Sequence, residues 1–460
     1  MNKIELLDIL NSYIVTKQLN DNKLLSGATT NIEQASDKDI VFYFLHENEK
    51  AEAALAKRLE FANPGIIITN RDSRIYKKRD RLIVSDFLES QRLIADALYP
   101  NHNKLKIVGV TGTNGKTTTV NLAVQLAKQA GKKAFSIGTL GVYDEDKEIY
   151  PTPNATTPSY LELRKIIHHF QESYDFIFME ISSHALVQKR LYDQKIVAAG
   201  WTSFSQDHLD YHKDIDDYFE AKTLIRDLME KNEPIYIPFH EKELQKRLKN
   251  KKVKYKNIEA KDLNRSSVPA SFKPLFNYNN LSLAKTLVTK ITGFESFDLE
   301  KLKLPKGRFS TYRVGECLFV IDYAHTPDAL VNICSSIKEA FPKSKLITVF
   351  GCGGDRDRTK RPLMGKAACE YSDVTIVTTD NPRFEDPEKI IEDVIPGLDK
   401  NYHLVTKREE AIKKAFDLVE GETIVLIAGK GHEEYQDIMG TKIDFSDFDV
   451  VEKIKRGHNV

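Results

Sequence analysis

Cysteine is scarce in this chain and follows no pattern. The sequence holds four widely spaced cysteines and no CxxC pair: Cys317, Cys334, Cys352 and Cys369. This spacing excludes a disulfide framework and a zinc ribbon, and it favours reduced thiols. We therefore expect a cytosolic protein.

The sequence also lacks an excess of one charge and a long apolar run. Lys plus Arg number 68 and Asp plus Glu number 67, so the overall field gives no reason to expect a nucleic acid or an anionic membrane as partner. The lysine-rich stretch at 246–256 is typical of a solvated helix face. No stretch approaches the roughly 18 apolar residues of a membrane span, and MNKIELLDIL is unlike a signal peptide. We expect a cytoplasmic protein that binds neither nucleic acid nor membrane.

What the chain does have is a succession of α/β patterns, without an internal repeat or a low-complexity tract. With 460 residues, 41% of them hydrophobic, it can form several domains that each bury a core. In residues 1–97, apolar runs at 40–45 and 65–69 read as short strands beside a helix at 49–61. A small N-terminal α/β domain is predicted.

Residues 98–302 show the pattern of a P-loop-type parallel sheet. KIVGV, a glycine turn, a helix that ends near Ala130, and KAFSIGT give strand, turn, helix and strand. The later runs DFIFME and AAGWTSFSQDH are further strands that end in polar residues. In a parallel sheet, ligands bind beyond the carboxyl ends of the strands, where these polar residues fall.

Residues 303–460 predict a second doubly wound, Rossmann-like domain. Four segments run from β-rich apolar residues into a polar loop with Gly or Pro: CLFVIDYAHTP, KLITVFGCGGDRD, DVTIVTTDNPR and ETIVLIAGKGHEEY. Polar residues at these strand ends are Asp322, His325, Arg356, Asn381, Arg383, Lys430, His432 and Glu433. Any one of them can be a helix cap or a surface ion pair. Four such strand ends in one domain indicate a binding site.

The segment VTGTNGKTTT, residues 110–119, is a candidate phosphate-binding loop. Its glycines allow backbone amides to close on phosphate oxygens, Lys116 adds a positive charge, and Thr117 can place a hydroxyl on magnesium. A helix from about Thr118 directs its positive end to the same place. The spacing departs from GxxxxGK[ST], since Val110 stands where glycine is usual, so a purely structural turn is the alternative.

Two further strand ends of the central region carry metal-binding side chains. Glu180 ends DFIFME, and His208 lies in DHLDYH after the next strand, so a carboxylate and an imidazole could face the phosphate loop. The alternative is a surface strand end and a hydrogen-bonded loop histidine. A zinc site at His208 and His212 is the weaker interpretation, because magnesium beside ATP prefers oxygen ligands and no cysteine is near.

A series of motifs resembles the Mur ligases, the ATP-dependent amide ligases of peptidoglycan precursor synthesis. They occur in the family's order across residues 108–437: GTNGKTTT, ATTP, MEISSHALVQKR, SQDHLDYH, YFEAKTLI, GRF, DYAHTPDAL, GCGGDRDRTKRPLMG, DNPRFEDP and GKGHEEYQ. Within the family they most resemble the members that join a diamino acid to UDP-N-acetylmuramoyl-L-alanyl-D-glutamate.

The resemblance implies a monomer with three domains. Residues 1–97 would bind the nucleotide sugar, 98–302 ATP and 303–460 the incoming amino acid. It implies ATP and Mg²⁺ as cofactors and small molecules as the only partners. The acceptor carboxylate would attack the γ-phosphate of ATP, and the amine would displace phosphate from the resulting acyl phosphate.

Carried over position by position, the resemblance assigns the site residues. The catalytic residues would be Lys116, Glu180, His208 and Lys222, and the metal ligands Thr117, Glu180, His208 and a carbamylated Lys222. ATP would contact Gly112, Thr113, Asn114, Gly115, Lys116, Thr117, Thr118, Asn277, Asn280, Arg308, Asp322 and His325. The muramoyl-peptide would contact Thr156, Thr157, Ser182, Gln188 and Arg190. The amino acid would contact Arg356, Asp380, Asn381, Arg383, Gly429 and Glu433.

The choice of amino acid and of acceptor rests on different parts of the chain. In the family, DNPR accompanies meso-diaminopimelate, whose distal carboxylate pairs with the arginine, here Arg383. In the N-terminal region NIEQASDKDIVFYFLHENEKAEAA replaces the family's usual glycine-containing segments, and Ser310 stands where GRFE has a glutamate. A ligase with a different, non-UDP carboxylate acceptor is therefore the alternative function. A non-catalytic ATP-binding protein is a third possibility, which the presence of all four catalytic positions disfavours.

Overall fold

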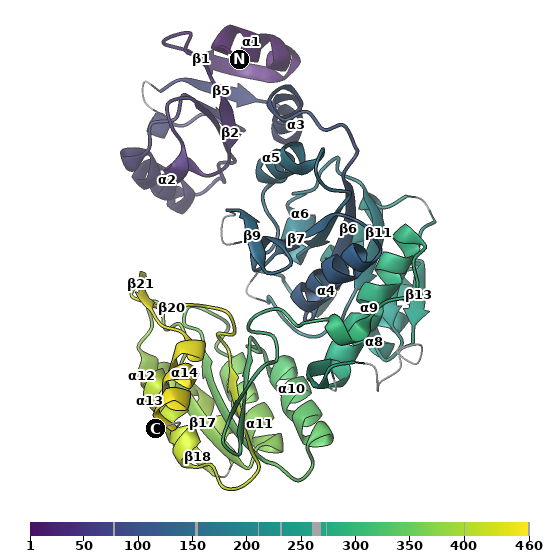
Figure 1. The fold of residues 1–460 in the computed structure, drawn as a ribbon. Coiled ribbons are helices and arrows are strands. Elements are labelled where there is room, and N and C mark those ends of the chain that lie inside the picture. Colours follow the sequence, from purple (N-terminus) through teal and green to yellow (C-terminus); the bar gives the residue numbers. More distant parts are fainter. Residues whose placement is uncertain are drawn as a thin grey trace.

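The computed structural model describes residues 1–76, 79–151, 155–209, 211–230, 232–259, 268–272, 274–399 and 401–458. The described chain forms three α/β parts that follow one another in space as in sequence (Figure 1). The N-terminus lies at one end of the molecule and the C-terminus at the other. The α/β fold class with three domains is as predicted from the sequence.

The N-terminal part is a five-stranded sheet in the order β1-β5-β4-β3-β2. Its strands are β1 (Ile14–Gln18), β2 (Gly27–Thr29), β3 (Asp39–Tyr43), β4 (Ile66–Thr69) and β5 (Arg81–Val84). All neighbours are parallel except the edge strand β1. Helices α1 (Lys3–Leu10) and α3 (Phe87–Leu98) share one core with the sheet, and α2 (Glu49–Phe61) packs in another. The two strands and the helix predicted within residues 40–69 are confirmed.

Alternation along β3 shows why this sheet has helices on both faces. Ile40 and Phe42 point into the core that contains α1 and α3, while Val41 points into the core that contains α2. Successive side chains of a strand point to opposite faces, so a run of apolar residues is buried on both sides.

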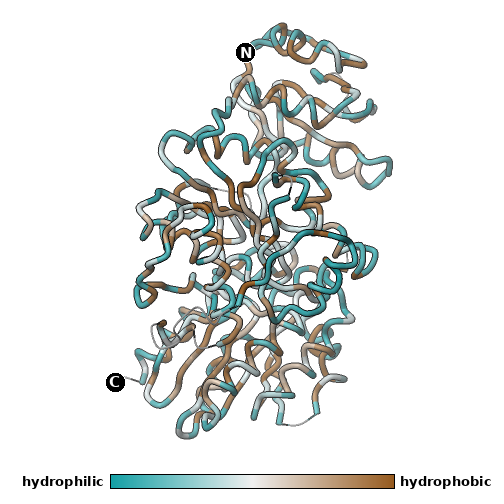
Figure 2. Tube along the Cα trace, turned by 90° about the vertical axis from the view of Figure 1, so that its right-hand side faces the viewer, coloured by the Kyte–Doolittle hydropathy of each residue, from teal (hydrophilic) through white to brown (hydrophobic). Residues whose placement is uncertain are grey.

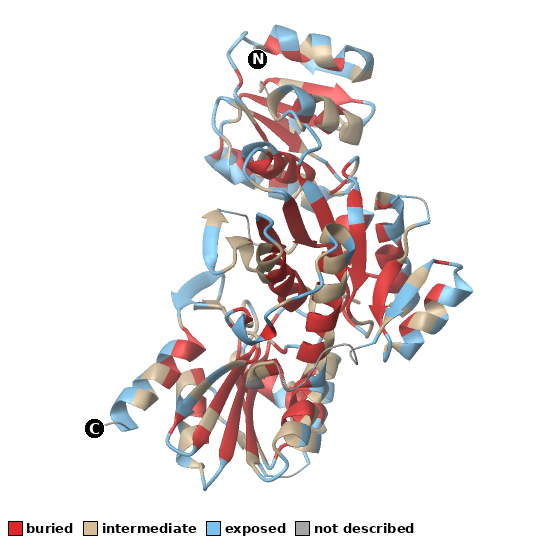
Figure 3. Cartoon of the chain, turned by 45° about the vertical axis from the view of Figure 1, so that its right-hand side comes forward, coloured by how far each residue is buried: buried red, intermediate tan, exposed pale blue. Residues whose placement is uncertain are grey.

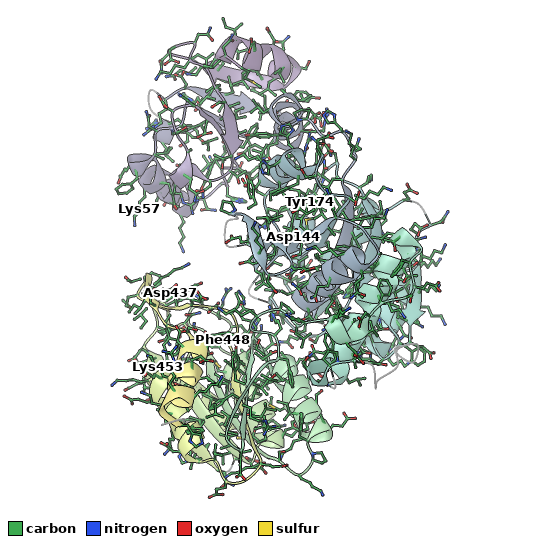
Figure 4. The ribbon with its side chains drawn as sticks, viewed as in Figure 1. Lys57, Asp144, Tyr174, Asp437, Phe448 and Lys453 are labelled. Carbon is green, nitrogen blue, oxygen red and sulfur yellow. The ribbon has the colours of Figure 1, made fainter. Side chains whose placement is uncertain are left out.

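The central part is an eight-stranded sheet in the order β13-β12-β11-β6-β10-β7-β8-β9. Its strands are β6 (Lys106–Thr111), β7 (Ala134–Gly138), β8 (Gly141–Asp144), β9 (Lys147–Tyr150), β10 (Phe176–Glu180), β11 (Ile196–Trp201), β12 (Ile235–Pro238) and β13 (Tyr255–Ile258). Among the described strands of this sheet, β8 alone runs against its neighbours, β7 and β9. The Tyr174 hydroxyl donates to Asp144 Oδ2, at the end of β8, at 3.0 Å, and Figure 4 labels both residues.

The central sheet is covered by helices α4 (Lys116–Gln129), α5 (Tyr160–Phe170), α6 (Ser183–Val187), α7 (Ile215–Thr223), α8 (Lys242–Asn250) and α9 (Leu275–Thr292). Helices α4 and α9 bury one face, and α5, α7 and α8 bury the other. Figure 3 shows the inner strands of this sheet as buried, while the outer strands β9 and β13 have no buried residue. In the parallel register, Glu180 of β10 lies opposite Val110 of β6, and Trp201 of β11 opposite Thr111. The loops after these three strands therefore start at one edge of the sheet.

The C-terminal part is a six-stranded sheet in the order β14-β15-β19-β16-β17-β18. Its strands are β14 (Ser310–Val314), β15 (Cys317–Asp322), β16 (Lys345–Cys352), β17 (Val374–Thr379), β18 (Tyr402–Leu404) and β19 (Thr423–Ala428), and a hairpin follows, β20 (Tyr435–Ile438) and β21 (Thr441–Asp444). Helices α10 (Pro327–Ala340), α11 (Lys360–Tyr371) and α12 (Pro387–Val394) cover one face. Helices α13 (Arg408–Asp417) and α14 (Asp447–His458) cover the other.

The sequence predicts neither disulfides nor membrane spans, and the described residues can be compared with both expectations. All four cysteines are buried and none forms a disulfide. No helix in the described part of the chain is long and apolar enough to cross a membrane. Figure 2 shows hydrophilic and hydrophobic residues interleaved along the chain.

Candidate active site

The loop between β6 and α4 has the backbone geometry of a phosphate-binding loop. Gly112 has φ +144° and Gly115, which caps α4, has φ +85°. A Cβ on Gly112 would lie 1.9 Å from Thr202 Oγ1, so only glycine fits there. Lys116 begins α4, two residues before the predicted start, and its Nζ donates to the carbonyls of Gly112 and Thr113 at 2.9 Å each.

A second buried lysine approaches the same loop from α7. Lys222 is 1% exposed, and its Nζ donates to the Gly112 carbonyl at 3.0 Å and lies 4.5 Å from the centre of the Tyr218 ring. Burial and the positive charge of Lys116 hold the pKa of Lys222 well below its ordinary value. The sequence pattern alone would have made Lys222 a surface residue, and that interpretation is wrong.

Glu180 is a buried group beside the phosphate loop, and His208 lies on the same side of the loop with its side chain 39% exposed. Glu180 is fully buried, and its carboxylate accepts from Thr139 N at 2.9 Å and from Thr139 Oγ1 at 3.2 Å. His208 has φ +55°, and burial lowers its pKa to about 4 against the opposing effect of Asp207. The imidazole is therefore neutral near pH 7, which suits a metal ligand.

The predicted acceptor-binding residues gather beside Glu180. Thr157 Oγ1 donates to the Glu180 carbonyl at 2.8 Å and accepts from Ser182 N at 3.1 Å. Arg190 Nη1 donates to the Thr157 carbonyl at 2.5 Å, and Arg190 Nε donates to Gln188 Oε1 at 3.0 Å. Thr156 Oγ1 lies 3.2 Å from Thr139 Oγ1. The structure thus brings this predicted set together at one strand end.

Asn280, one of the residues predicted to contact ATP outside the loop, lies against Gly115. A Cβ on Gly115 would lie 2.4 Å from Asn280 Oδ1, so the amide packs on the loop. Asn277, one turn earlier on α9, donates instead to the Ser271 carbonyl at 3.0 Å. Asp322 accepts from the amides of Phe309 and Ala324 at 2.8 Å each, and burial raises its pKa.

Side chains of the C-terminal part reach the phosphate loop directly. Arg308 Nη2 donates to Thr117 Oγ1 at 3.3 Å, with its guanidinium 4.4 Å from the centre of the Tyr323 ring. Asp328 Oδ2, at the start of α10, accepts from Asn114 Nδ2 at 3.2 Å and from Ser205 Oγ at 3.0 Å. The sequence prediction missed Asp328, although it lies in the quoted motif DYAHTPDAL.

A cavity of about 160 Å³ lies where the central and C-terminal parts meet. All of the residues predicted to bind the amino acid line it, namely Arg356, Asp380, Asn381, Arg383, Gly429 and Glu433. Asp207 and His208 line it from the central part, and Asp207 forms an ion pair of 2.7 Å with Lys360 of α11. His325, predicted to contact ATP, also lines this cavity.

Within the cavity, polar groups form one network. Asn381 Nδ2 donates to Glu433 Oε2 at 2.8 Å, and the buried Lys430 Nζ donates to Asn381 Oδ1 and to Glu433 Oε2 at 3.0 Å each. Arg383 Nη1 donates to the Gly354 carbonyl at 2.6 Å. The carboxylate of Glu433 and the guanidinium groups of Arg356 and Arg383, all in the cavity lining, suit a ligand with both an ammonium and a carboxylate.

In the described part of the chain, no three His, Cys, Asp or Glu side chains form a group that could bind a metal unaided. Glu180, His208 and the Thr117 hydroxyl around the phosphate loop fit Mg²⁺ instead, because magnesium usually takes one or two protein ligands together with substrate phosphates. The zinc interpretation of His208 and His212 has no support, since His212 Nε2 lies 2.9 Å from Ser183 Oγ and Nδ1 lies 3.3 Å from Asp217.

Comparison with known proteins gives the family. The model of the Mur ligase middle domain matches residues 110–287, and that of the Mur ligase glutamate ligase domain matches 307–431. The chain belongs to the Mur ligase family. UDP-N-acetylmuramoyl-L-alanyl-D-glutamate–2,6-diaminopimelate ligase of Rickettsia montanensis is 36% identical over 470 residues, which cover 95% of this chain and 97% of that protein. The enzyme of the same name from Clostridium botulinum is 36% identical over 83% of this chain and 85% of its own length.

Solved Mur ligases have the same fold. A structure of UDP-N-acetylmuramoyl-L-alanyl-D-glutamate–2,6-diaminopimelate ligase superposes with TM-score 0.57 at 28% identity over 95% of this chain and 96% of that one. MurF ligase from Thermotoga maritima in complex with ADP gives TM-score 0.59 at 16% identity over 89% and 95% of the two chains. The three-domain arrangement is therefore that of the Mur ligases.

Proposed function

We propose that this Mur ligase is an ATP-dependent amide ligase that adds meso-diaminopimelate to the D-glutamate of UDP-N-acetylmuramoyl-L-alanyl-D-glutamate in peptidoglycan precursor synthesis. The observation that carries the proposal is the cavity between the two larger sheets. Its lining combines Arg356, Asn381, Arg383 and Glu433 with His208, which also flanks the phosphate loop. An amine in this cavity can reach an acyl phosphate formed at the loop.

The chain's own residues account for formation of the acyl phosphate. The loop amides and the Lys116 ammonium bind the transferring phosphoryl group, and the loop after β10 orients the acceptor carboxylate through Ser182 and Arg190. Magnesium held by Thr117, Glu180 and His208 would offset charge on the phosphates. Water is kept away because the C-terminal part closes over the loop through Arg308 and Asp328.

Lys222 is proposed to work as a carbamate. Burial and the charge of Lys116 lower the pKa of its amine and so favour the neutral form, whose nitrogen can attack CO₂, form the N–C bond and release one proton. The product is an anion next to Lys116, and it would supply the oxygen ligands that an amine cannot give to a second magnesium ion.

The amino acid is proposed to bind with its distal carboxylate at Arg383 and Arg356. Glu433, held by Asn381 and Lys430, then faces an ammonium group of the same ligand. L-Lysine has no distal carboxylate to pair with these guanidinium groups.

We also propose the domain boundaries 1–97, 98–302 and 303–460, with the nucleotide sugar bound by the first domain. A monomer suffices, since all the residues named above lie in one chain. Buried, unpaired cysteines support a reducing cytoplasm.

An altered N-terminal sequence favours one alternative, a ligase for a non-UDP carboxylate. The matched family models cover residues 110–287 and 307–431, so neither includes the N-terminal region. The relative from Rickettsia montanensis, however, aligns over 95% of the chain. Phosphate release from ATP distinguishes the two. Turnover only with the UDP-linked dipeptide supports the main proposal, and equal turnover with the dipeptide lacking UDP-sugar supports the alternative.

A further inference from the structure

The hairpin of β20 and β21 contacts the loop that carries Arg383. It turns at Met439 and Gly440, which have φ +52° and +77°, and it stands apart from the six-stranded sheet, at the side of the C-terminal part that faces the N-terminal part (Figure 1). Asp437, labelled in Figure 4, lies on its first strand.

The backbone of the hairpin holds the backbone of Arg383 from both sides. Arg383 N donates to the Asp437 carbonyl at 2.9 Å, and Met439 N donates to the Arg383 carbonyl at 2.7 Å. Arg383 itself has φ +50°. A residue with a side chain rarely adopts this left-handed conformation unless its surroundings hold it there.

The residues before Arg383 are held by the same strand. Gln436 Nε2 donates to the Asp380 carbonyl at 2.8 Å, and Asp437 N donates to Asn381 Oδ1 at 3.0 Å. Asn381 is thereby oriented to donate to Glu433. Asp380, Asn381 and Arg383, which all line the cavity, thus depend on one short hairpin.

We infer that Gln436 is a positioning residue, and the hairpin a specificity-determining element, for an amino acid with a distal carboxylate. This inference rests on the proposed function. Gln436 is not among the residues that line the cavity, so it acts through the Asp380 carbonyl. A hydrogen bond that fixes the loop before the ligand arrives lowers the cost of aligning Arg383 with the carboxylate.

The test is Gln436→Met, which keeps the size of the side chain and removes its donor. We expect the KM for meso-diaminopimelate to rise about tenfold, with kcat changed less than about twofold, because a small misplacement of a binding group weakens binding of the ligand it contacts. The preference for meso-diaminopimelate over L-lysine in kcat/KM should fall by the same factor, and the KM values for ATP and for the acceptor should not change.

Gln245→Met is the matched control, since Gln245 Nε2 also donates to a backbone carbonyl, that of Phe239 at 2.7 Å, on the surface of the central part. A second pair of variants changes the turn: Gly440→Val strains a residue at φ +77°, while Gly421→Val makes the same change at φ +58° with open space around it. Gly440→Val should repeat the Gln436→Met pattern, and both controls should keep wild-type kinetics.

The outcomes separate this inference from the function on which it rests. A wild-type protein without diaminopimelate-dependent turnover would overturn both. An active wild type whose Gln436→Met and Gly440→Val variants keep the full preference for meso-diaminopimelate over L-lysine would overturn the inference alone. A fall in kcat with every amino acid alike would also overturn it, because it would point to a general structural role.

Discussion

Lys222 shows how burial changes the chemistry of a single side chain. A lysine on the surface is a hydrated cation, but in this structure the ammonium form is disfavoured by desolvation and by Lys116 nearby. The same desolvation keeps His208 neutral. Desolvation therefore favours the neutral forms of Lys222 and His208 beside the phosphate loop.

Replacement of Lys222 by alanine should lower kcat by about a hundredfold or more, because the carbamate and the contact with the Gly112 carbonyl are both lost. Since the deleted side chain leaves a space beside Lys116, added formate or acetate should restore part of the activity. Steady-state rates with and without the carboxylate measure this. A Lys222→Ala enzyme with full turnover would contradict the assigned role.

Arg383→Lys should raise the KM for meso-diaminopimelate by about tenfold to a hundredfold, because lysine cannot form a bidentate pair with a carboxylate. Arg358→Lys is the control, since Arg358 is an exposed arginine that also contacts a carboxylate, that of Asp393. Initial rates at varied amino-acid concentration provide the measurement. Equal KM values for wild type and Arg383→Lys would rule out a pairing of Arg383 with the distal carboxylate.

At the scale of elements, helix α10 connects the C-terminal part to the phosphate loop of the central part. Its Asp328 accepts hydrogen bonds from Asn114 and Ser205, which lie on two different loops of the central sheet. Thr326, not Asp328, caps the helix. The carboxylate of Asp328 is therefore available to hold the two parts together.

Asp328→Ala should raise the KM for ATP by about fivefold. It removes the two hydrogen bonds that this half-buried carboxylate accepts from Asn114 and Ser205, and each is worth about 1 kcal/mol or less. Glu388→Ala removes an exposed acid from the first turn of α12 and should leave this KM unchanged. If both variants bind ATP like the wild type in calorimetric titration, the contact of α10 with the loop has no part in nucleotide binding.

Elements with a strong apolar pattern could be predicted from the sequence, and elements fixed by distant partners could not. The sequence predicts β10 and β15, which end at Glu180 and Asp322, and β17, which precedes the loop with Arg383, because each runs from buried residues into a polar loop. Strands β8, β9 and β14 were missed, because they are short antiparallel strands in which at most one residue is buried. The buried Arg408–Asp447 pair joins α13 to α14, two helices whose contact no local pattern reveals.

At the scale of the whole molecule, the site lies at the junction of separate sheets. The phosphate loop and Glu180 come from the central sheet, while Arg308, Asp328 and the amino-acid cavity come from the C-terminal one. Motif order in the sequence predicted which residues would meet, but the contacts between the two parts, such as Lys360 with Asp207, needed the structure. The N-terminal part, to which we propose that the nucleotide sugar binds, lies outside the matched family models.

The most direct test of the account is phosphate release from ATP with three substrate sets. These are meso-diaminopimelate with UDP-N-acetylmuramoyl-L-alanyl-D-glutamate, the same amine with the dipeptide lacking UDP-sugar, and L-lysine with the UDP-linked acceptor. The account predicts rapid turnover with the first set and little with the other two. ATP binding without turnover in any set would contradict it.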